Sequence, residues 1–242
     1  MLITSSDNKK VKDLVKLKQK KYRDIENRFI VETEHLIKEA YIEGVLEEVY
    51  ILENEKLSFE IDCPVYYVSE SIMNKMKDIK TSKYIGKCIK KDSNEYIGKK
   101  YLMLDRVSDP GNMGTIIRSA VAFDIDTLII SDDSCDVYND KTIRATEGAL
   151  FRLNIIRENL EEALTNLKKL NINIYGTDVT KGESIGTVNK NNFCVIMGNE
   201  GSGISDKVKR KVDKYIHLDT NNVESLNVAV ATSIILYELD KK

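Results

Sequence analysis

Residues 193–205 read FCVIMGNEGSGIS, and the rest of the chain can be understood from this stretch outward. Its first half, Phe193 to Met197, is a short apolar run of the kind that forms a buried strand. Three glycines then fall within six residues, Gly198 to Gly203, where they allow positive φ and close approach of a ligand to the main chain. In α/β sheets ligands bind at strand ends of this kind. The stretch therefore predicts a strand that leads into a binding loop, although a plain glycine-rich turn has the same composition.

The loop differs from the two common phosphate-binding loops. It contains no G-x-G-x-x-G pattern, and no Lys-Ser/Thr pair follows Gly203 as a Walker loop requires. A phosphate-loop nucleotide hydrolase is therefore not expected.

Composition sets the broad class of the protein. The chain has 242 residues, 42% hydrophobic and 31% charged, which is enough for one large or two small soluble domains. No apolar run approaches the ~20 residues that span a bilayer, and the first residues contain no apolar signal region. The four cysteines are widely scattered, and together with the missing signal region this favours reduced thiols in the cytoplasm over disulfides. Because the chain has only two histidines, no metal site is expected.

The first 95 residues predict a small α/β module, because short apolar strands alternate with helical patterns. Residues 5–8, SSDN, offer several helix caps before an amphipathic first helix. Strands are expected at 28–31, 45–52 and 64–68, and helices at 34–43 and 70–77. The polar stretch 90–95 marks the expected boundary between a domain of residues 1–95 and one of residues 96–242.

The amino-terminal end is strongly basic. Residues 1–23 hold eight lysine or arginine side chains against two aspartates. Such an arm predicts a polyanionic partner, although the same charges are also typical of a solvated helix face.

From residue 99 the alternation of strands and helices is stronger. Strands are expected at 101–104, 127–130, 153–156, 172–177, 193–198 and 215–218, and helices at 113–123, 141–150 and 159–170. This order predicts a mainly parallel sheet of about six strands. The last helix, expected over 224–239, is apolar on almost every side, so it should be buried in the domain or in a subunit interface.

Two further motifs accompany the glycine-rich loop. Residues 105–118, DRVSDPGNMGTIIR, predict a strand end, a turn that ends on the capping-type residue Asn112, and a helix that carries Arg118 roughly one and a half turns in. Arg118 could form a structural ion pair on the surface, or it could hold a phosphate or a developing oxyanion. Residues 223–231, VESLNVAVA, form the other motif, in which Ser225 could simply cap the last helix.

Together the three motifs closely resemble those of the SpoU/TrmH family of RNA ribose 2′-O-methyltransferases. That pattern runs D-x-x-x-D-P-x-N-x-G-x-x-x-R, then G-N/x-E-G-x-G, then S-L-N-V-x-V-A, and all three parts occur here in order within residues 101–239. The amino-terminal part resembles the RNA substrate-binding module of one branch of the family. The residues that carry this second likeness are Ile3-Thr4-Ser5, Asn8, Lys21-Tyr22-Arg23 and Phe29-Ile30-Val31-Glu32.

The resemblance implies a small α/β RNA-binding module followed by a knotted α/β SPOUT domain, with a trefoil knot, S-adenosylmethionine as cofactor and a homodimer formed through the last helix. The residues implied to cradle the cofactor are Thr177, Gly198, His217 and Leu226. The residues implied to be catalytic are Asn112, Arg118, Glu200, Ser225 and Asn227. RNA contacts are expected at Asn8, Lys9, Lys12, Lys21, Arg23 and Arg144.

The chemistry constrains the roles of these residues. Methyl transfer from a sulfonium needs in-line approach of the nucleophile, and a ribose hydroxyl must lose its proton as it attacks. Arginine is a poor proton acceptor, because its pKa stays above ~12. We therefore expect Arg118 to stabilise the developing alkoxide and to grip the adjacent phosphate, with the other four residues ordering it and the substrates. Glu200 as general base is the alternative, and the sequence leaves both open.

Two departures from the family pattern stand out. Relatives commonly have I-P-M-x-G before the third motif, where this chain has residues 217–221, HLDTN. Asn221 replaces the glycine, and asparagine is the next best residue at positive φ. In the amino-terminal module Thr33 follows Glu32 where Glu-Gly is usual, which affects the turn after it.

These observations predict a two-domain cytoplasmic enzyme that methylates a ribose 2′-hydroxyl in structured RNA. Large-subunit (23S) ribosomal RNA is favoured over tRNA, on the amino-terminal module alone. A non-catalytic RNA-binding or ribosome-assembly factor of the same fold is the alternative from another class. The presence of all five catalytic-type residues argues against that alternative.

Overall fold

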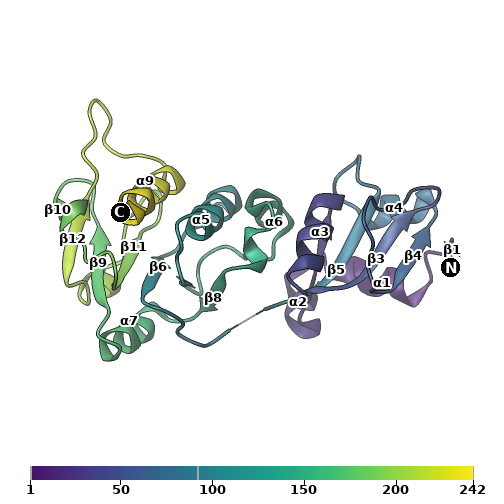
Figure 1. The fold of residues 1–242 in the computed structure, drawn as a ribbon, viewed down its shortest axis with the longest axis horizontal. Helices are drawn as coiled ribbons and strands as arrows, with labels where there is room; N and C mark the ends of the chain where they lie inside the picture. Colours follow the sequence, from purple (N-terminus) through teal and green to yellow (C-terminus); the bar gives the residue numbers. More distant parts are fainter. Residues whose placement is uncertain (1, 92, 242) are drawn as a thin grey trace. The chain divides into compact units, whose positions relative to one another are not determined.

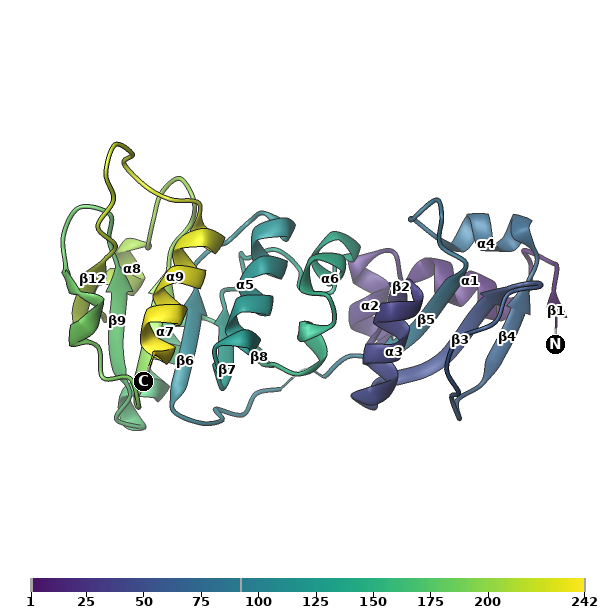
Figure 2. The ribbon, with the colours of Figure 1, turned by 45° about the horizontal axis from the view of Figure 1, so that its top comes forward.

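The structure, a computed structural model, describes residues 2–91 and 93–241. Its packing divides the chain into two compact units, each built around its own sheet (Figures 1 and 2). The first unit runs to Lys91 and also contains Tyr138–Phe151, and the second holds the remainder of the chain. No helix in the described part of the chain is long and apolar enough to cross a membrane.

The first unit contains a five-stranded mixed sheet in the order β1-β4-β3-β5-β2. Its strands are β1 (Leu2–Ile3), β2 (Arg28–Glu32), β3 (Leu46–Leu52), β4 (Val65–Val68) and β5 (Tyr84–Ile89). Its helices include α1 (Lys9–Lys16), α2 (Lys20–Glu26), α3 (Glu34–Ile42) and α4 (Glu70–Met76). The amphipathic helix α1 turns Val11 and Leu14 into a core that it shares with α4 and one face of the sheet.

All the elements expected in this module are present, but β1, α2 and β5 were missed. The sequence of β5, YIGKCI, alternates poorly because Gly86 and Lys87 interrupt the apolar run. A Cβ at Gly86 would lie 2.9 Å from side-chain atoms of Leu46 and Val31 in the neighbouring strands and 3.1 Å from Ile37 of α3, so glycine fits where α3 packs tightly on the sheet.

Residues 138–151 pack with the first unit, whereas the division at residue 95 assigned them to the second. The ring of Phe29 lies 4.8 Å from that of Tyr138 and 6.1 Å from that of Phe151, so the three aromatic residues share one core. The single helix expected over 141–150 is in fact α6 (Asp140–Thr146) followed by a short 3₁₀ turn, η1 (Ala149–Phe151). The helix ends because Glu147 and Gly148 both have positive φ.

The second unit is a seven-stranded sheet in the order β10-β12-β9-β11-β6-β7-β8, in which every pairing is parallel. Its strands are β6 (Lys100–Leu104), β7 (Thr127–Ile130), β8 (Asn154–Arg157), β9 (Asn173–Thr177), β10 (Glu183–Ser184), β11 (Phe193–Met197) and β12 (Lys214–His217). Every residue of β7 and β11 is buried, as expected of parallel strands covered on both faces.

Helices cover the two faces of this sheet. Helices α5 (Pro110–Ala122) and α9 (Val228–Asp240) lie side by side on one face, where the hydroxyls of Ser119 and Ser233 are 2.7 Å apart (Figures 1 and 2). Helices α7 (Leu160–Lys169) and α8 (Asp206–Lys209) pack on the other face. A 3₁₀ turn, η2 (Ile185–Thr187), follows the short edge strand β10.

The strand order creates a point where the chain changes direction across the sheet. From β6 the chain passes outward to β7 and β8, and then returns to β9 on the far side of β11. In open parallel sheets the crevice for a ligand lies at the carboxyl ends of the strands beside such a switch point. Here those ends belong to β6 and β11. Strand β6 leads into the motif of residues 105–118, and β11 leads into the glycine-rich loop.

Candidate active site

Four neighbouring strands deliver candidate residues to one edge of the sheet. Leu104 pairs with Met197, Ile196 with Gly176, and Ile216 with Thr177, so β6, β11, β9 and β12 end at similar heights. The residues at or just beyond these ends therefore lie along one edge, the upper edge of the second unit in Figure 2. They are Asp105, Gly198, Thr177 and His217.

The glycine-rich loop closes on itself. A side chain at Gly198 would lie only 2.2 Å from the backbone carbon of Gly203, so no other residue fits there. The backbones of Asn199 and Gly203 exchange two hydrogen bonds of 3.1 and 2.9 Å. The Asn199 Oδ1 also accepts hydrogen bonds from the backbone N–H groups of Gly201 and Ser202, at 3.0 and 3.1 Å. The loop is therefore an ordered turn that presents Glu200 at its tip.

A chain of hydrogen bonds joins all three motifs. Asn227 Nδ2 donates to Asn112 Oδ1 at 3.0 Å, and Asn112 Nδ2 donates to Glu200 Oε1 at 3.0 Å. The direction of this chain is fixed, because Asn227 Oδ1 already accepts from the backbone N–H groups of Ala229 and Val230. The amide nitrogen of Asn227 must then face Asn112, and Asn112 must in turn donate to the carboxylate of Glu200.

Both helix caps in this network differ from the expected ones. Helix α5 begins at Pro110 and is capped by Asp109, whose Oδ1 accepts from the backbone N–H of Asn112 at 2.8 Å. The prediction that Asn112 caps the helix was wrong, and its side chain is consequently available to the network. Helix α9 begins at Val228 rather than at Glu224, and its cap is Asn227 rather than Ser225.

Two of the expected catalytic residues lie outside this network. Ser225 is exposed in the loop that connects β12 to α9. Arg118 is exposed on α5. Helix geometry places it about 9 Å from Asn112 along the helix axis and about a third of a turn around that axis. Within residues 2–91 and 93–241 its guanidinium has no hydrogen-bond or ion-pair partner, so it is free to bind an anion.

The expected cofactor residues lie along the same strand ends. Thr177 Oγ1 donates to the backbone carbonyl of Ile196 at 2.9 Å, which ties β9 to β11 beside Gly198. His217 Nε2 lies 2.9 Å from Asp219 Oδ1, whereas the buried Nδ1 has no partner among the described residues. A buried ring nitrogen without a partner at a strand end offers a hydrogen-bonding position for a polar cofactor. The residues present therefore fit an adenosyl group.

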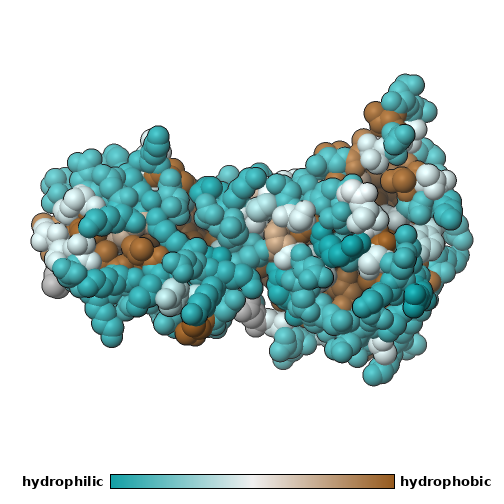
Figure 3. Space-filling view, turned by 180° about the vertical axis from the view of Figure 1, so that it is seen from behind, coloured by the Kyte–Doolittle hydropathy of each residue, from teal (hydrophilic) through white to brown (hydrophobic). Residues whose placement is uncertain are grey.

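The loops around this position are themselves ordered by hydrogen bonds. Burial raises the pKa of Asp178, but hydrogen bonds from Thr180 and from the backbone N–H of Lys181 outweigh it, so the pKa falls below its ordinary value. The positive φ expected at Asn221 occurs instead at Asn222. The half-buried Leu226 lies in the same protruding loop, which exposes hydrophobic atoms including those of Val223 (Figure 3).

The basic arm is largely neutralised within the first unit. At least five of its cations form ion pairs among the described residues: Lys10 with Glu48, Lys12 with Asp7, Lys16 with Asp13, Lys18 with Asp78 and Lys20 with Asp24. Lys9 and Lys21 have no ion pair in that part of the chain. An arm with an excess of six positive charges thus presents far fewer unpaired ones.

The other expected RNA contacts have mixed placements. Arg23 is only 6% exposed and donates to the backbone carbonyls of Leu17 and Lys18 at 2.9 and 2.8 Å, so its guanidinium is a structural brace between α1 and α2. Asn8 caps α1 through a 3.0 Å hydrogen bond from Lys10 N–H. Arg144 lies on α6 and pairs with Asp140 at 2.9 Å.

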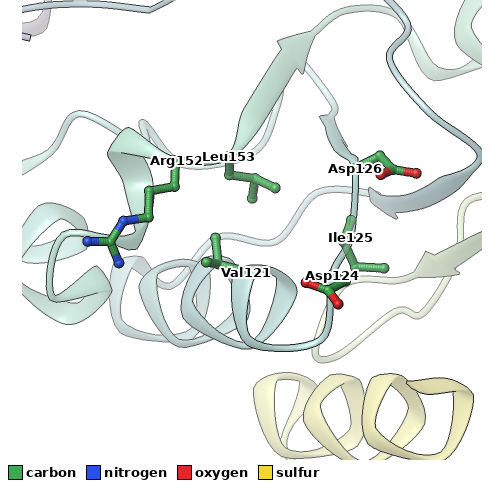
Figure 4. A pocket seen from close by; sticks show the side chains of 6 residues that line it. All are labelled: Val121, Asp124, Ile125, Asp126, Arg152 and Leu153. Carbon is green, nitrogen blue, oxygen red and sulfur yellow. The ribbon is translucent and has the colours of Figure 1, made fainter. Parts of the chain in front are cut away.

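The second unit also contains a recess of about 350 Å³, but it lies at the opposite edge of the sheet (Figure 4). Its polar side chains are Asp124, Asp126 and Arg152, of which Asp126 and Arg152 point to opposite sides of the recess. Asp126 accepts from the backbone N–H groups of Lys99 and Lys100, both at 2.8 Å, which gives it a structural role. The three motifs meet at the other edge of the sheet, at the strand ends.

Sequence reasoning missed three residues that shape the site. Asp105 is buried and accepts from the backbone N–H of Ser205 at 2.6 Å. Arg106 donates to the carbonyl of Gly203, and Asn199 holds the glycine-rich loop together. Only their position in the sequence could have indicated a role in the site, because each lies within two residues of the end of a buried strand.

Comparison with known proteins places this geometry in a family. The sequence profile of the SpoU rRNA Methylase family matches residues 99–237, and that of the MRM3-like substrate binding domain matches residues 8–85. The chain belongs to the SpoU rRNA methylase family. The expected recognition is thereby confirmed for both the catalytic part and the amino-terminal module.

Relatives of this family match along nearly the whole chain. A Bacillus subtilis protein named 23S rRNA (guanosine(2553)-2′-O)-methyltransferase RlmP is 33% identical over 98% of each chain. Among solved structures, a putative RNA methyltransferase of the TrmH family from Porphyromonas gingivalis superposes with a TM-score of 0.86 at 28% identity, over 96% of this chain and 97% of that one.

An rRNA methyltransferase from Sinorhizobium meliloti, described as bound to AdoMet, also superposes with a TM-score of 0.86, at 27% identity over 99% of this chain and 97% of that one. The mixed α/β fold with a mainly parallel sheet is therefore the SPOUT fold of this family, as predicted. The trefoil knot is not traced by the strand pairings and stays a prediction.

Proposed function

We propose that this protein transfers the methyl group of S-adenosylmethionine to a ribose 2′-hydroxyl in large-subunit ribosomal RNA. The observation that carries the proposal is the chain Asn227–Asn112–Glu200, which joins all three family motifs at the switch point of the sheet. A relative that matches 98% of the chain is named for this reaction on a guanosine of 23S rRNA, which supports that substrate class. Such a reaction belongs to the cytoplasm, where ribosomes are assembled.

Binding of the cofactor is assigned to the strand ends. S-adenosylmethionine supplies an electrophilic methyl group on a sulfonium. Gly198 and Leu226 would offer main-chain contacts, Thr177 fixes the neighbouring strand, and the buried Nδ1 of His217 provides a hydrogen-bonding position. These residues orient the methyl group for in-line attack, in which positioning carries much of the rate.

Handling of the substrate proton is assigned to Arg118 and the RNA rather than to Glu200. Both oxygens of Glu200 already accept amide hydrogens, from Asn112 at 3.0 Å and from Asn199 at 3.3 Å. We therefore assign Glu200 to ordering the site. The guanidinium of Arg118, which has no partner among the described residues, can stabilise a developing alkoxide and grip the adjacent phosphate, which would then take up the proton.

A homodimer through α9 is part of the proposal. One face of this helix leaves Val230, Ile234 and Tyr237 exposed by 47, 38 and 51%, so the helix is not buried on every side within one chain. The same face of a second copy would cover this apolar stripe in a symmetric contact. Sedimentation of Ile234→Glu should show a monomer where the unchanged protein sediments as a dimer. A monomeric unchanged protein would contradict this part of the proposal.

RNA recognition is assigned to the first unit, with Lys9 and Lys21, which have no ion pair among the described residues, and with Lys12 and Arg144 at its surface. Titration calorimetry with S-adenosylmethionine, followed by methyl-transfer assays on unmodified 23S rRNA and tRNA transcripts, tests the whole proposal. Cofactor binding with methylation of the rRNA transcript alone is expected. Methylation of tRNA alone would shift the substrate class, and cofactor binding without transfer to either RNA would favour an assembly factor.

A further inference from the structure

Arg106 has an unusual backbone conformation at the centre of the site. It is the second residue after β6, and its φ of +61° lies in the left-handed region that favours glycine. A large side chain is uncommon there and is maintained only where surrounding contacts impose it. The contacts of Arg106 explain why this residue holds that conformation.

Both backbone groups of Arg106 are used. Its N–H donates to Ser131 Oγ at 2.9 Å, beyond the end of β7. Its carbonyl oxygen accepts from Asn199 Nδ2 at 2.9 Å, in the glycine-rich loop. The left-handed turn lets one residue serve the end of β7 and the loop after β11 together.

The side chain returns to the same loop. Arg106 Nη2 donates to the carbonyl of Gly203 at 3.1 Å, and Nε donates to Asp105 Oδ1 at 3.1 Å. The other oxygen of Asp105 accepts from the backbone N–H of Ser205. The pair therefore holds the loop at Asn199, at Gly203 and at Ser205, while the remaining bonds of the loop are mostly internal.

We propose that Arg106 is a positioning residue that clamps the glycine-rich loop, and through Asn199 the carboxylate of Glu200, in the arrangement used for methyl transfer. The link is short, because Asn199 Nδ2 contacts both the Arg106 carbonyl at 2.9 Å and Glu200 Oε2 at 3.3 Å. Glu200 then holds Asn112 and, through it, Asn227. This inference rests on the proposed function for its kinetic consequence, but its structural part does not.

Three variants test the clamp. Arg106→Gly accommodates the backbone conformation while it removes the guanidinium, and Arg106→Lys keeps a cation that can reach only one acceptor. Asp124→Gly is the matched control, because Asp124 also has positive φ, at +51°, but lies beside the recess at the opposite edge of the sheet (Figure 4). Each variant is measured by hydrogen–deuterium exchange of residues 199–205, by thermal unfolding, and by steady-state methyl transfer from S-adenosylmethionine to a 23S rRNA transcript.

The clamp predicts exchange of residues 199–205 that is about fivefold faster or more in Arg106→Gly, and about a tenfold lower kcat/KM. Arg106→Lys should fall between that variant and the unchanged protein, and Asp124→Gly should match the unchanged protein in exchange and kinetics. Exchange and kcat/KM of Arg106→Gly within twofold of the unchanged protein would overturn the inference. If the unchanged protein transfers no methyl group, the proposed function fails, while the exchange of residues 199–205 still decides whether the clamp exists.

Discussion

Replacing Thr33 by glycine should stabilise the first unit. Thr33 stands between β2 and α3 with φ +96° and ψ 143°, a conformation that a β-branched residue adopts only under strain. The turn is held from outside, because the buried carboxylate of Glu32 accepts from the backbone N–H groups of Asp78 and Ile79 at 2.6 and 2.8 Å. Family members commonly have glycine here, so this chain keeps the backbone conformation and carries its cost.

The magnitude follows from three opposing contributions. Relief of the strained φ contributes ~1–3 kcal/mol, while added freedom of the unfolded chain costs ~0.5–1 kcal/mol. The Thr33 hydroxyl caps α3 through a long 3.3 Å bond from Leu36 N–H, and replacing such a cap by glycine costs only ~0.3 kcal/mol. The net gain is then ~1 kcal/mol, which raises Tm by ~2–8 °C, depending on how much of the chain unfolds cooperatively.

Comparing the urea unfolding of Thr33→Gly with that of Asn27→Gly separates the relief of backbone strain from the change in chain entropy. Asn27 also has positive φ, at +53°, but asparagine tolerates that region, so this control adds the same chain entropy with little relief. We expect Thr33→Gly to raise the free energy of unfolding and Asn27→Gly to lower it slightly. Equal effects of the two substitutions, or a less stable Thr33→Gly, would refute the assignment of strain to Thr33.

Three further predictions concern catalysis, RNA binding and pH. Arg118→Ala should lower kcat by ~10²–10³-fold, as loss of an oxyanion-stabilising donor does, with calorimetric affinity for S-adenosylmethionine within twofold; lost cofactor affinity would instead indicate a structural role. The double substitution of Lys9 and Lys21 by alanine should reduce the salt slope of rRNA binding by ~1.5–2. Lys16→Ala removes a lysine that is already in an ion pair, so it should leave the slope unchanged. Equal slopes for the double variant, Lys16→Ala and the unchanged protein would remove the arm from the binding surface. Hydrogen bonds from Arg28 lower the pKa of Glu47 below its ordinary 4.5. The stability that the charged Glu47 contributes is therefore present above pH 4.5 and is lost as the pH falls through the lowered pKa. Urea unfolding should therefore show a difference between Glu47→Gln and the unchanged protein that is constant at neutral pH and shrinks below about pH 4; a difference that does not change with pH would contradict this role.

Elements with a continuous local signal could be predicted from the sequence. Strands β7 and β11 are apolar at every position because both of their faces are covered, and that pattern needs no tertiary information. Residues 138–151 could not be assigned in this way. Their place in the first unit depends on the contact of Tyr138 and Phe151 with Phe29, which is more than 100 residues away in the sequence.

The site was predictable to the level of its motifs and no further. Pattern placed Asn112, Glu200 and Asn227 in one site, and the structure joins them. It could not show that Asp109 caps α5 and so leaves Asn112 available, because two capping-type residues three positions apart compete equally in the sequence. Nor could it show that Arg23 is buried, since burial depends on how α1 and α2 fold over its guanidinium.

Mapping of ribose methylation tests the central claim most directly. The purified protein would be incubated with S-adenosylmethionine that carries a labelled methyl group and with an unmodified 23S rRNA transcript, and the product digested and analysed by mass spectrometry. The account predicts one labelled 2′-O-methyl group, on a ribose of the 23S rRNA transcript. It also predicts that Asn112→Ala, which breaks the link between Asn227 and Glu200, incorporates far less label. Label on a base, or no label in the rRNA at all, would contradict it.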